Sequence, residues 1–312
     1  MYNKGMQSLS QIAIILVDYN GEKDTRECLL SLKEIRSTSF AFSVVVVDNG
    51  SKEILTIPPE KMPKETAIVR SDANLGFTNG NNLGITYALE HSSPDYIVLL
   101  NNDTTVDAHF LEEMLKCAQK NEHVGMVTPK IFFSAGREYH KESYKEEERG
   151  KVLWYAGGSI DWRNLDAFHR GVDEVDRGQF DTQTESDFAT GCCVLIPRPV
   201  LEKIGRFNQK YFLYLEDVDL SMRVREIGER VLFCPTAKVW HKNAGSSGGA
   251  GSVLHQYYQT RNRLFFFFTY GQLRTRWVTI KYGLKLFLHG NTFERLATID
   301  WLVGRMGKQA VL

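Results

Sequence analysis

The stretch Tyr96-Ile97-Val98-Leu99-Leu100-Asn101-Asn102-Asp103 is an apolar run that ends in three polar side chains. A short, continuously apolar run predicts a strand that is buried on both faces. Open α/β folds bind their ligands in the crevice at the carboxyl ends of such strands. We therefore expect Asn101, Asn102 and Asp103 to lie at a ligand-binding edge of a sheet.

The same pattern recurs upstream, where three further strand-like runs each lead to polar or glycine residues. These runs are Ile12–Val17 before Asp18-Tyr19-Asn20-Gly21, Phe42–Val47 before Asp48-Asn49-Gly50-Ser51, and Ala67–Val69 before Asn74-Leu75-Gly76-Phe77. Stretches with helical periodicity separate them, including one at Asn82–Glu90. This alternation predicts an α/β fold with a Rossmann-like, mainly parallel central sheet that helices cover on both faces.

The second half of the chain is less regular. We expect helices at Asp107–Lys120, Pro199–Ile204 and from about Glu216 to Ile227, with Leu220, Val224 and Ile227 facing inward. Strands are expected at Gly191–Ile196, Val231–Phe233 and Val239–Trp240. The charged stretch Ser134–Gly150 and the polar stretch Asp161–Asp187 are typical of surface loops.

A second acidic cluster, Glu216-Asp217-Val218-Asp219, and the later His241 complete the candidate chemistry. Clustered carboxylates repel each other unless one binds a cation or accepts a proton. One carboxylate can hold a divalent cation against a diphosphate, while another removes a proton from an attacking hydroxyl. This layout indicates a metal-dependent nucleotide-sugar transferase. Taken singly, Asp103 could instead cap a turn, and the acidic cluster could simply stabilise a helix start.

Composition narrows the alternatives. The chain has 312 residues, 43% of them hydrophobic, and 38 basic and 38 acidic side chains, so nothing global suggests nucleic-acid binding. The five cysteines are odd in number and show no C-x-x-C spacing, so they indicate neither a disulfide framework nor a zinc site. No signal-peptide pattern precedes the first strand, and no apolar stretch approaches the roughly 20 residues that span a bilayer. We expect a cytoplasmic protein, or one bound to the inner face of the cytoplasmic membrane.

The last part of the chain changes character after the Gly/Ser-rich stretch Asn243–Ser252. There the apolar block Leu264–Phe268 precedes Arg274, Arg276, Lys281 and Lys285, which alternate with apolar residues. This pattern is typical of amphipathic helices that lie at a membrane interface. It equally fits helices that pack on the main domain with a solvated basic face or an oligomer interface.

Taken in order, five segments resemble family 2 glycosyltransferases of the GT-A fold, in the rhamnosyltransferase-like branch that builds bacterial surface polysaccharides. They are Val17–Gly21, Val46–Ser51, Asn74–Phe77 with Gly80–Asn82, Leu99–Asp103, and Phe212–Leu220. The resemblance implies a GT-A domain over residues 1–253 and a helical extension over 254–312. Within the domain it implies a nucleotide-binding part at about 11–130 and an acceptor part at about 150–253.

The resemblance also implies an activity. It is the transfer of a sugar, with inversion, from dTDP-rhamnose or a UDP-hexose to an oligosaccharide or lipid-linked acceptor. Asp217 would be the general base, and Asp103 and His241 would bind Mg²⁺ or Mn²⁺. Asp48 would read the nucleobase. The remaining substrate contacts would come from Asp18, Tyr19, Asn20, Asn101, Asn102 and Glu216, together with Asn74, Gly76 and Asn81 in a loop that lines the nucleotide pocket.

One residue departs from the family pattern: Asn101 replaces the first carboxylate of the DxD motif, which leaves Asp103 as its single charge. We expect weaker metal affinity from this substitution. Two other functions stay open: a catalytically inactive nucleotide-sugar or glycan-binding module on the same fold, and a Rossmann oxidoreductase. The second lacks the G-x-G-x-x-G turn, since Asp18-Tyr19-Asn20-Gly21 stands in its place.

Overall fold

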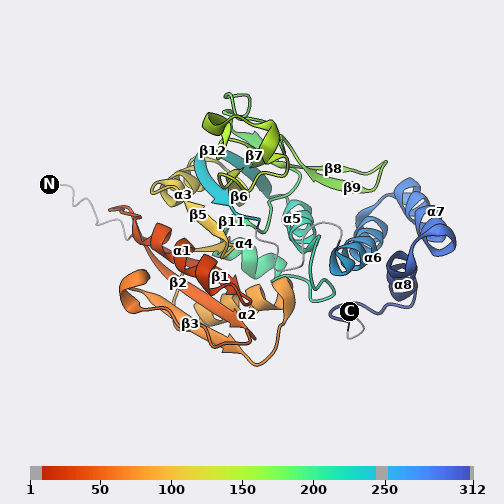
Figure 1. Cartoon of the computed structure of the whole chain (residues 1–312), viewed down its shortest axis with the longest axis horizontal. Helices are drawn as coiled ribbons and strands as arrows, with labels where there is room; N and C mark the ends of the chain where they lie inside the picture. Colours follow the sequence, from red (N-terminus) through yellow and green to blue (C-terminus); the bar gives the residue numbers. More distant parts are fainter. Residues whose placement is uncertain (1–8, 244–251, 310–312) are drawn as a thin grey trace.

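The computed structural model describes residues 9–243 and 252–309, which form a large α/β body and a group of helices at one side (Figure 1). The first half of the chain forms four parallel strands in the order β3-β2-β1-β4. Their bounds are Ser10–Asp18 for β1, Phe40–Asn49 for β2, Thr66–Ser71 for β3 and Tyr96–Leu100 for β4. The predicted parallel sheet is confirmed in this half.

Alternate residues of these strands pack against helices on opposite faces of the sheet. Helix α1 (Glu22–Lys33) packs Cys28, Leu29 and Leu32 against one face, with Ile14 and Val46. Helix α2 (Gly76–His91) packs Ile85 and Ala88 against the other face, with Ile15 and Val45. Both faces are apolar because both are covered. The polar ends of the strands therefore remain as the edge where a ligand can bind.

The second half extends the same sheet, in the order β10-β12-β6-β11-β4. Strand β11 (Cys193–Pro197) is antiparallel to both β4 and β6 (Val124–Phe133), whereas β12 (Arg230–His241) is parallel to β6. We expected a mainly parallel sheet, and β11 is an antiparallel strand within it. An apolar run reports burial on both faces and carries no information on strand direction.

Several bounds also differ from the expectations. The pieces Val231–Phe233 and Val239–Trp240 belong to the single strand β12, whose register shifts between Cys234 and Lys238. Ile227 is exposed and lies just after α5 (Glu216–Glu226). The stretch expected as a loop before β11 contains a hairpin, β8 (Gly158–Asp161) and β9 (Asp166–His169), followed by β10 (Thr184–Glu185). The other elements are β5 (Thr104–Val106), α3 (Phe110–Lys120), β7 (Leu153–Tyr155), α4 (Arg198–Ile204) and three 3-10 helices at Pro59–Lys61, Lys141–Ser143 and Glu146–Glu148.

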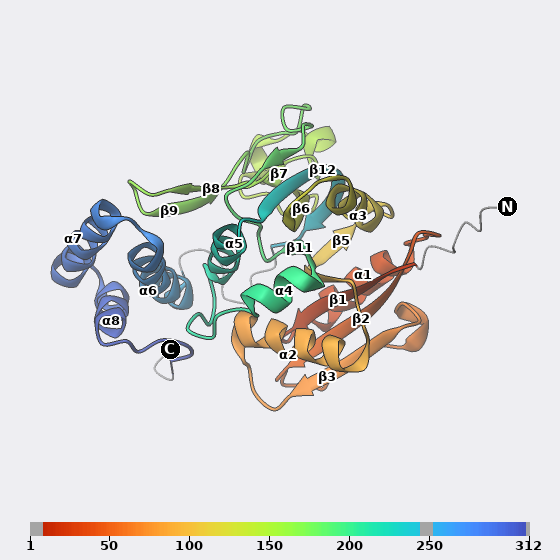
Figure 2. The same ribbon diagram turned by 180° about the vertical axis from the view of Figure 1, so that it is seen from behind.

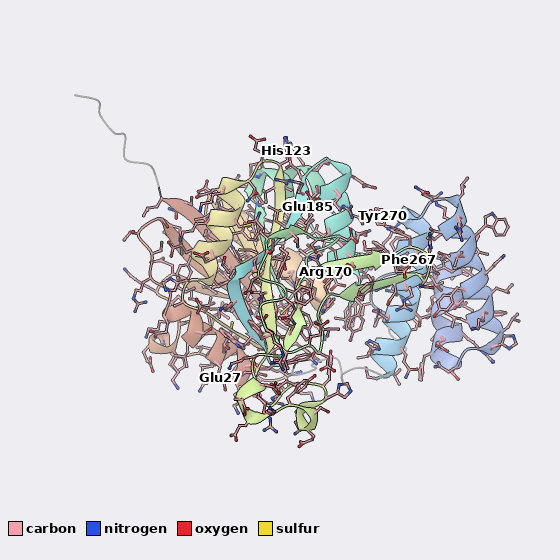
Figure 3. All side chains as sticks on the ribbon, turned by 90° about the horizontal axis from the view of Figure 1, so that it is seen from above. Glu27, His123, Arg170, Glu185, Phe267 and Tyr270 are labelled. Carbon is pink, nitrogen blue, oxygen red and sulfur yellow. The ribbon has the colours of Figure 1, made fainter. Side chains whose placement is uncertain are left out.

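Three C-terminal helices, α6 (Val253–Tyr270), α7 (Leu273–His289) and α8 (Thr292–Leu302), lie beside the body (Figure 2). Most of the Gly/Ser-rich stretch before them, residues 244–251, lies outside the described residues. Helix α6 meets the body through the β8–β9 hairpin, where Trp162 lies 5.9 Å from the ring of Phe266 and 5.5 Å from that of Phe267. Figure 3 labels Phe267 and Tyr270 on this side of α6. The apolar block therefore largely packs inward. In the described ranges, no helix is both long and apolar enough to cross a bilayer.

Candidate active site

Two carboxylates end the first two strands side by side. Asp18 of β1 and Asp48 of β2 are register partners, and both side chains are buried. Ser51 joins them, because its Oγ donates to Oδ2 of Asp18 at 3.1 Å and its backbone N–H donates to Oδ1 of Asp48 at 3.0 Å. The two predicted nucleotide-binding loops are thus held together by one serine.

Asp18 is surrounded by donors. The Thr25 hydroxyl donates to its Oδ1 at 2.6 Å, and the amide Nδ2 of Asn102 donates to the same atom at 3.1 Å. Burial raises the pKa of Asp18 despite these hydrogen bonds. Asn102 also donates to Oγ1 of Thr25 at 2.8 Å, so it ties the end of β4 to the start of α1. Its position supports a role in ordering the Asp18 loop.

Asp48 has a different electrostatic environment. Burial alone would raise its pKa, but hydrogen bonds from the amides of Ser51 and Leu55 and from Arg70 outweigh burial and lower it. Arg70 is the register partner of Asp48 on β3 and also donates to the carbonyl of Ser51 at 2.9 Å. We did not predict Arg70 from the sequence. Arg70 comes directly after the expected strand Ala67–Val69, but its pairing with Asp48 became clear only once the β2–β3 register was known.

The loop beside Asp18 is equally ordered. Asn20 has a left-handed backbone with φ of 55°, and its Oδ1 accepts a hydrogen bond from the amide of Lys52 at 2.8 Å. Its own amide donates to Oγ of Ser51 at 2.9 Å. Tyr19 is half-buried in the same turn. Asp18, Tyr19, Asn20 and Asp48 therefore lie together at the carboxyl ends of β1 and β2.

The predicted loop Asn74–Asn82 is mostly helix, because α2 begins at Gly76 and not at Asn82. Asn74 accepts a hydrogen bond from the Gly76 amide at 2.8 Å. Asn81 is buried, and its Nδ2 donates within the helix to the Phe77 carbonyl at 2.9 Å. Asn49 was not among the predicted site residues, yet it accepts from the Leu75 amide at 2.9 Å and donates to the Gly76 carbonyl at 3.1 Å.

Gly76 is the point where this helix start meets the second half of the chain. Its φ is +75°, and a Cβ there would lie 2.4 Å from the Phe212 ring and 2.6 Å from the Phe212 carbonyl. The next amide, that of Phe77, donates to the same carbonyl at 3.1 Å. Only glycine meets both the conformation and the close approach. The Asn74 segment and the aromatic segment before Glu216 are thereby brought together.

Asp103 and His241, the two predicted metal ligands, are neighbours. Oδ1 of Asp103 lies 3.1 Å from Nε2 of His241, and Nδ2 of Asn101 lies 3.5 Å from the same nitrogen. Pairing of β5 with β12 sets this geometry, since Thr104 is the register partner of His241 and the Lys242 amide donates to the Asp103 carbonyl at 2.9 Å. His241 is buried, and its ring meets that of Trp154 edge-on at 4.5 Å.

This pair suits a divalent cation that is only partly coordinated by protein. Within the described ranges, no group of three or more His, Cys, Asp or Glu side chains is arranged to hold a metal ion. Metals that bind nucleotides typically take one or two protein ligands, and phosphate oxygens and water supply the rest. Nitrogen and oxygen ligands each about 2.1 Å from one ion, at right angles, lie about 3 Å apart. The 3.1 Å between Asp103 and His241 matches that spacing.

Asp217 is held at the amino end of α5. Its Oδ2 accepts a hydrogen bond from the Gly191 amide at 2.8 Å, and its Oδ1 accepts from the Val218 amide at 2.8 Å. Burial raises the pKa of Asp217, although these amide hydrogen bonds act in the opposite direction. A carboxylate with a raised pKa is a stronger proton acceptor, which suits a general base.

The other two acids of the cluster differ from Asp217. Asp219 is engaged on both oxygens, by Arg223 at 3.0 Å and by the hydroxyl of Tyr270 at 3.0 Å. Glu216 is buried, and its Oε2 has no hydrogen-bond partner among the described residues. Burial, together with the nearby charges of Asp217 and Asp219, raises the pKa of Glu216 well above its ordinary value. Both oxygens of Asp219 are thus occupied by other protein groups, and Asp217 stays the predicted base.

Helix α6 supports the turn that precedes α5. Tyr214 and Leu215 both have positive φ, 71° and 66°, a conformation that is uncommon for residues with side chains. The amide Nδ2 of Asn262 donates to the carbonyls of Leu213 at 2.8 Å and Tyr214 at 3.0 Å. Asn262 is fully buried. It was not predicted, because nothing in the sequence relates α6 to a turn so far upstream.

A short backbone path links the proposed base to the metal pair. Gly191 binds Asp217, and the carbonyl of the next residue, Cys192, accepts a hydrogen bond from the Asn101 amide at 2.8 Å. Burial raises the pKa of the Cys192 thiol well above its ordinary value, and the charges of Asp103 and Asp217 both add to that shift. The hydrogen bonds through Gly191 and Cys192 connect the segment that holds Asp217 to the strand end beside Asp103.

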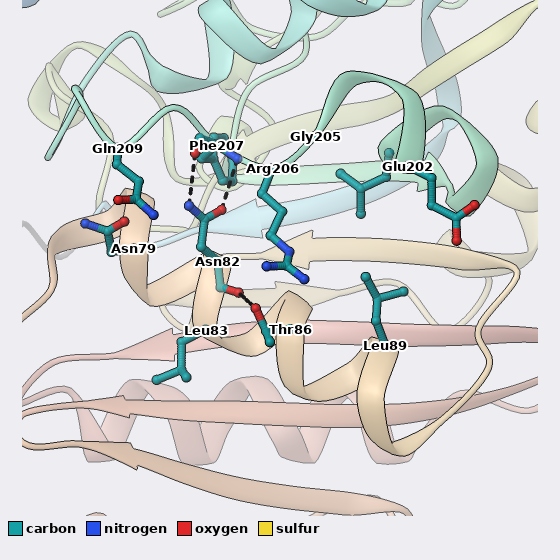
Figure 4. Close-up of a pocket in the computed structure, with 11 residues that line it drawn as sticks. Asn79, Asn82, Leu83, Thr86, Leu89, Glu202, Gly205, Arg206, Phe207 and Gln209 are labelled. Atoms are coloured by element: carbon teal, nitrogen blue, oxygen red, sulfur yellow. Dashed lines mark hydrogen bonds between the residues drawn. The ribbon is translucent and has the colours of Figure 1, made fainter.

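A pocket of about 710 Å³ lies elsewhere, between α2 and the segment around α4. Its lining includes Leu83, Thr86, Arg206 and Gln209 (Figure 4). Asn79 and Asn82, at the end of the predicted loop Asn74–Asn82, also line it, but none of the individually predicted site residues does. There Asn82 accepts from the Phe207 amide at 3.0 Å and donates to the Phe207 carbonyl at 2.9 Å. These bonds fix α2 to the chain that follows α4.

Comparison with known proteins agrees with this geometry. The family model described as Glycosyltransferase like family 2 matches residues 10–279. A low-salt glycan biosynthesis hexosyltransferase of Haloferax volcanii is 23% identical over 82% of this chain and 75% of its own length. An N-acetylglucosaminyl-diphospho-decaprenol L-rhamnosyltransferase of Mycobacterium tuberculosis is 22% identical over 76% of this chain and 78% of its own length. The rhamnosyltransferase WbbL of Escherichia coli is 25% identical over 53% of this chain and 60% of its own length.

Solved structures share the fold. One is the mannosyltransferase PcManGT from Pyrobaculum calidifontis in complex with GDP-Man and Mn²⁺, which superposes with a TM-score of 0.55 at 14% identity. The match covers 96% of this chain and 89% of the PcManGT chain. GalNAc-T7 with UDP, GalNAc and Mn²⁺ superposes with a TM-score of 0.60 at 13% identity. That match covers 96% of this chain and 56% of GalNAc-T7. The predicted GT-A fold is confirmed by these superpositions.

Proposed function

Because the chain belongs to the Glycosyltransferase like family 2, we propose that it transfers a sugar from a nucleotide-diphosphate donor to an acceptor hydroxyl with inversion. The general statement, a glycosyltransferase of polysaccharide or glycan biosynthesis, follows from its family and its relatives. The donor, the stereochemistry and the individual roles of the residues are the proposal. The observation that supports it is the backbone path from Asp217 through Gly191 and Cys192 to Asn101, whose side chain lies beside His241 of the Asp103–His241 pair.

We assign metal binding to Asp103 and His241, with Asn101 beside them. A divalent cation held there would offset the charge that develops on the departing diphosphate. The Mn²⁺ in the titles of both structural neighbours supports the choice of a divalent ion. The two atoms that would hold the ion are Nε2 of His241 and Oδ1 of Asp103, which lie 3.1 Å apart.

We assign proton removal to Asp217. The amides of Gly191 and Val218 fix its carboxylate, and burial makes it more basic than an exposed aspartate. During attack, the acceptor hydroxyl would pass its proton to a carboxylate oxygen of Asp217 while its own oxygen bonds to the anomeric carbon. The bond from that carbon to the diphosphate oxygen would break, which leaves a nucleoside diphosphate.

The nucleotide would bind at the corner formed by Asp18, Tyr19, Asn20 and Asp48, beside the start of α2 at Asn74 and Gly76. Asn81 and Asn102 would act by ordering this corner, since their amide groups are already bonded to protein atoms. Glu216 would contact substrate from the start of α5. The names of the relatives support dTDP-rhamnose or a UDP-hexose as donor and a lipid-linked or oligosaccharide acceptor.

A panel of nucleotide sugars, assayed for transfer and for slow donor hydrolysis with Mg²⁺ or Mn²⁺, tests this function. The proposal predicts turnover with at least one donor and none without an added cation. Binding of nucleotide with no hydrolysis or transfer across the panel would instead favour the inactive binding module. No binding of any nucleoside diphosphate would contradict both functions.

A further inference from the structure

Helix α7 has an apolar face that is turned to solvent. Its buried residues are Thr275, Thr279, Gly283 and Leu286, mostly small or polar side chains. Six of its large apolar residues are instead exposed: Leu273, Trp277, Ile280, Leu284, Phe287 and Leu288, with Leu273 79% and Trp277 64% accessible. A water-facing helix normally has the opposite arrangement.

These six residues form one continuous stripe, here called the α7 stripe. At 3.6 residues per turn, they fall within an arc of about 100° on the helix. The buried residues occupy the opposite side, where a Cβ on Gly283 would lie 3.1 Å from the ring of Trp301 of α8. The inner side is therefore occupied by α6 and α8, and the α7 stripe is a separate, outer surface.

Positive charge borders the α7 stripe on both sides. Arg274, Lys281 and Lys285 follow one border and Arg276 the other, and all four are exposed. Helix α7 contains no aspartate or glutamate, although the whole chain has zero net charge. None of the four makes an ion pair within residues 9–243 and 252–309. The helix is thus a concentrated patch of cations around an apolar centre.

We propose that the α7 stripe docks the protein on a bilayer surface that contains anionic phospholipid. An amphipathic helix of this kind lies in the plane of the interface, with its apolar side chains among the acyl chains and its cations at the headgroups. Trp277 is suited to the headgroup boundary. The same face pairs poorly with a second copy of itself, because neither copy supplies a carboxylate on α7 for these cations.

Docking at α7 bears on the site through α6. Helix α6 packs against α7 and, through Asn262, holds the turn before Glu216 and Asp217. A membrane-bound α7 would connect the bilayer, through α6, to the turn that precedes Asp217. The docking itself does not depend on the proposed chemistry and can be tested without it.

Vesicle flotation of the full chain tests the docking. We expect binding to vesicles of phosphatidylcholine mixed with phosphatidylglycerol, little binding to phosphatidylcholine alone, and a loss of binding as salt rises and screens the charges. Lys281→Gln and Lys285→Gln should each weaken partitioning about fivefold, which corresponds to ~1 kcal/mol per cation. On binding, Trp277 fluorescence should shift to the blue and be quenched by brominated lipid.

Leu284→Ala and Trp277→Ala should each reduce partitioning more than Ile54→Ala, an equally simple truncation of an exposed apolar residue on the body. Because all three side chains are exposed, their thermal midpoints should stay close to the wild-type value, and transfer to a water-soluble acceptor should not change. Equal binding of the α7 variants and wild type would overturn the proposal. So would a stable dimer that Trp277→Ala dissociates, with no vesicle binding by the wild type.

Discussion

Oδ2 of Asp217 accepts a hydrogen bond from the amide of Gly191 at 2.8 Å, which joins the start of α5 to the segment leading into β11. Since β11 pairs with β4, this bond connects the acidic cluster to the strand that ends at Asn101. Gly191 also has little room for a side chain, because a Cβ there would lie 2.8 Å from the ring of Phe77 and 3.5 Å from Cβ of Asp217. The position of the proposed base thus depends on three segments that are distant in sequence.

The buried Glu216 predicts a pH-dependent change in stability. Its pKa in the folded protein is raised above the unfolded value of about 4.3, so ionisation opposes folding. This penalty is absent below about pH 4.3 and grows as pH rises toward the folded pKa. Glu216→Gln should therefore raise the free energy of unfolding at neutral pH, by on the order of 1–3 kcal/mol, and the gain should vanish in acid.

Denaturant unfolding of both proteins across the pH range measures this difference. Glu53→Gln, at an exposed position, serves as the control and should change stability little. A Glu216→Gln variant less stable than wild type at neutral pH would mean that the carboxylate has a stabilising partner in solution.

At Gly76, the cost in stability of a clash with Phe212 can be separated from the cost of a positive φ. Gly76→Ala forces both a positive φ and a clash with Phe212, whereas Gly228→Ala forces only a positive φ of +82°, since nothing lies within 4 Å of a Cβ there. Gly228→Ala should cost about 1 kcal/mol, and Gly76→Ala should cost more. Thermal or denaturant unfolding compares them, and equal losses would mean that Phe212 moves aside freely.

The metal assignment predicts matched losses at two residues. Asp103→Ala and His241→Ala should each weaken cation-dependent binding of a nucleoside diphosphate, on the order of 10–100-fold, while the exposed Glu60→Ala should not. Calorimetric titration of UDP, GDP and dTDP with Mg²⁺ or Mn²⁺ measures this. Chelation should reproduce the effect, and full activity in excess EDTA would remove both residues from a metal site.

A substitution at Asn101 should strengthen the binding of the cation. Asn101→Asp supplies a second carboxylate beside His241, whose Nε2 lies 3.5 Å from Nδ2 of the present asparagine. The cation concentration for half-maximal activity should fall in this variant, because affinity rises with the charge of the ligands. A metal titration of transfer measures it, and an unchanged midpoint would place Asn101 outside the ion's reach.

The strands of the first half and the placing of polar residues at their ends could be predicted, because buried strands and their polar ends leave a local pattern in the sequence. What could not be predicted depends on contacts between distant segments. The hydrogen bonds from the Asn262 side chain to the Leu213 and Tyr214 carbonyls are one example, and the Asp48–Arg70 ion pair is another. The start of α2 was placed too late, because Asn74, Gly76 and Gly80 look like loop residues and the helix there is set by packing on Phe212 and Val17.

The role of Asp217 as the base is the central claim, and Asp217→Asn tests it most directly, with single-turnover transfer and calorimetric donor binding measured on the same protein. The side-chain oxygen of the asparagine can still accept the hydrogen bond from the Gly191 amide. The asparagine cannot take a proton from the hydroxyl of the sugar acceptor. We predict a loss of roughly 10²–10⁴ in the transfer rate, with donor and metal affinity nearly unchanged. Wild-type turnover in this variant would contradict the account and move the base to Glu216.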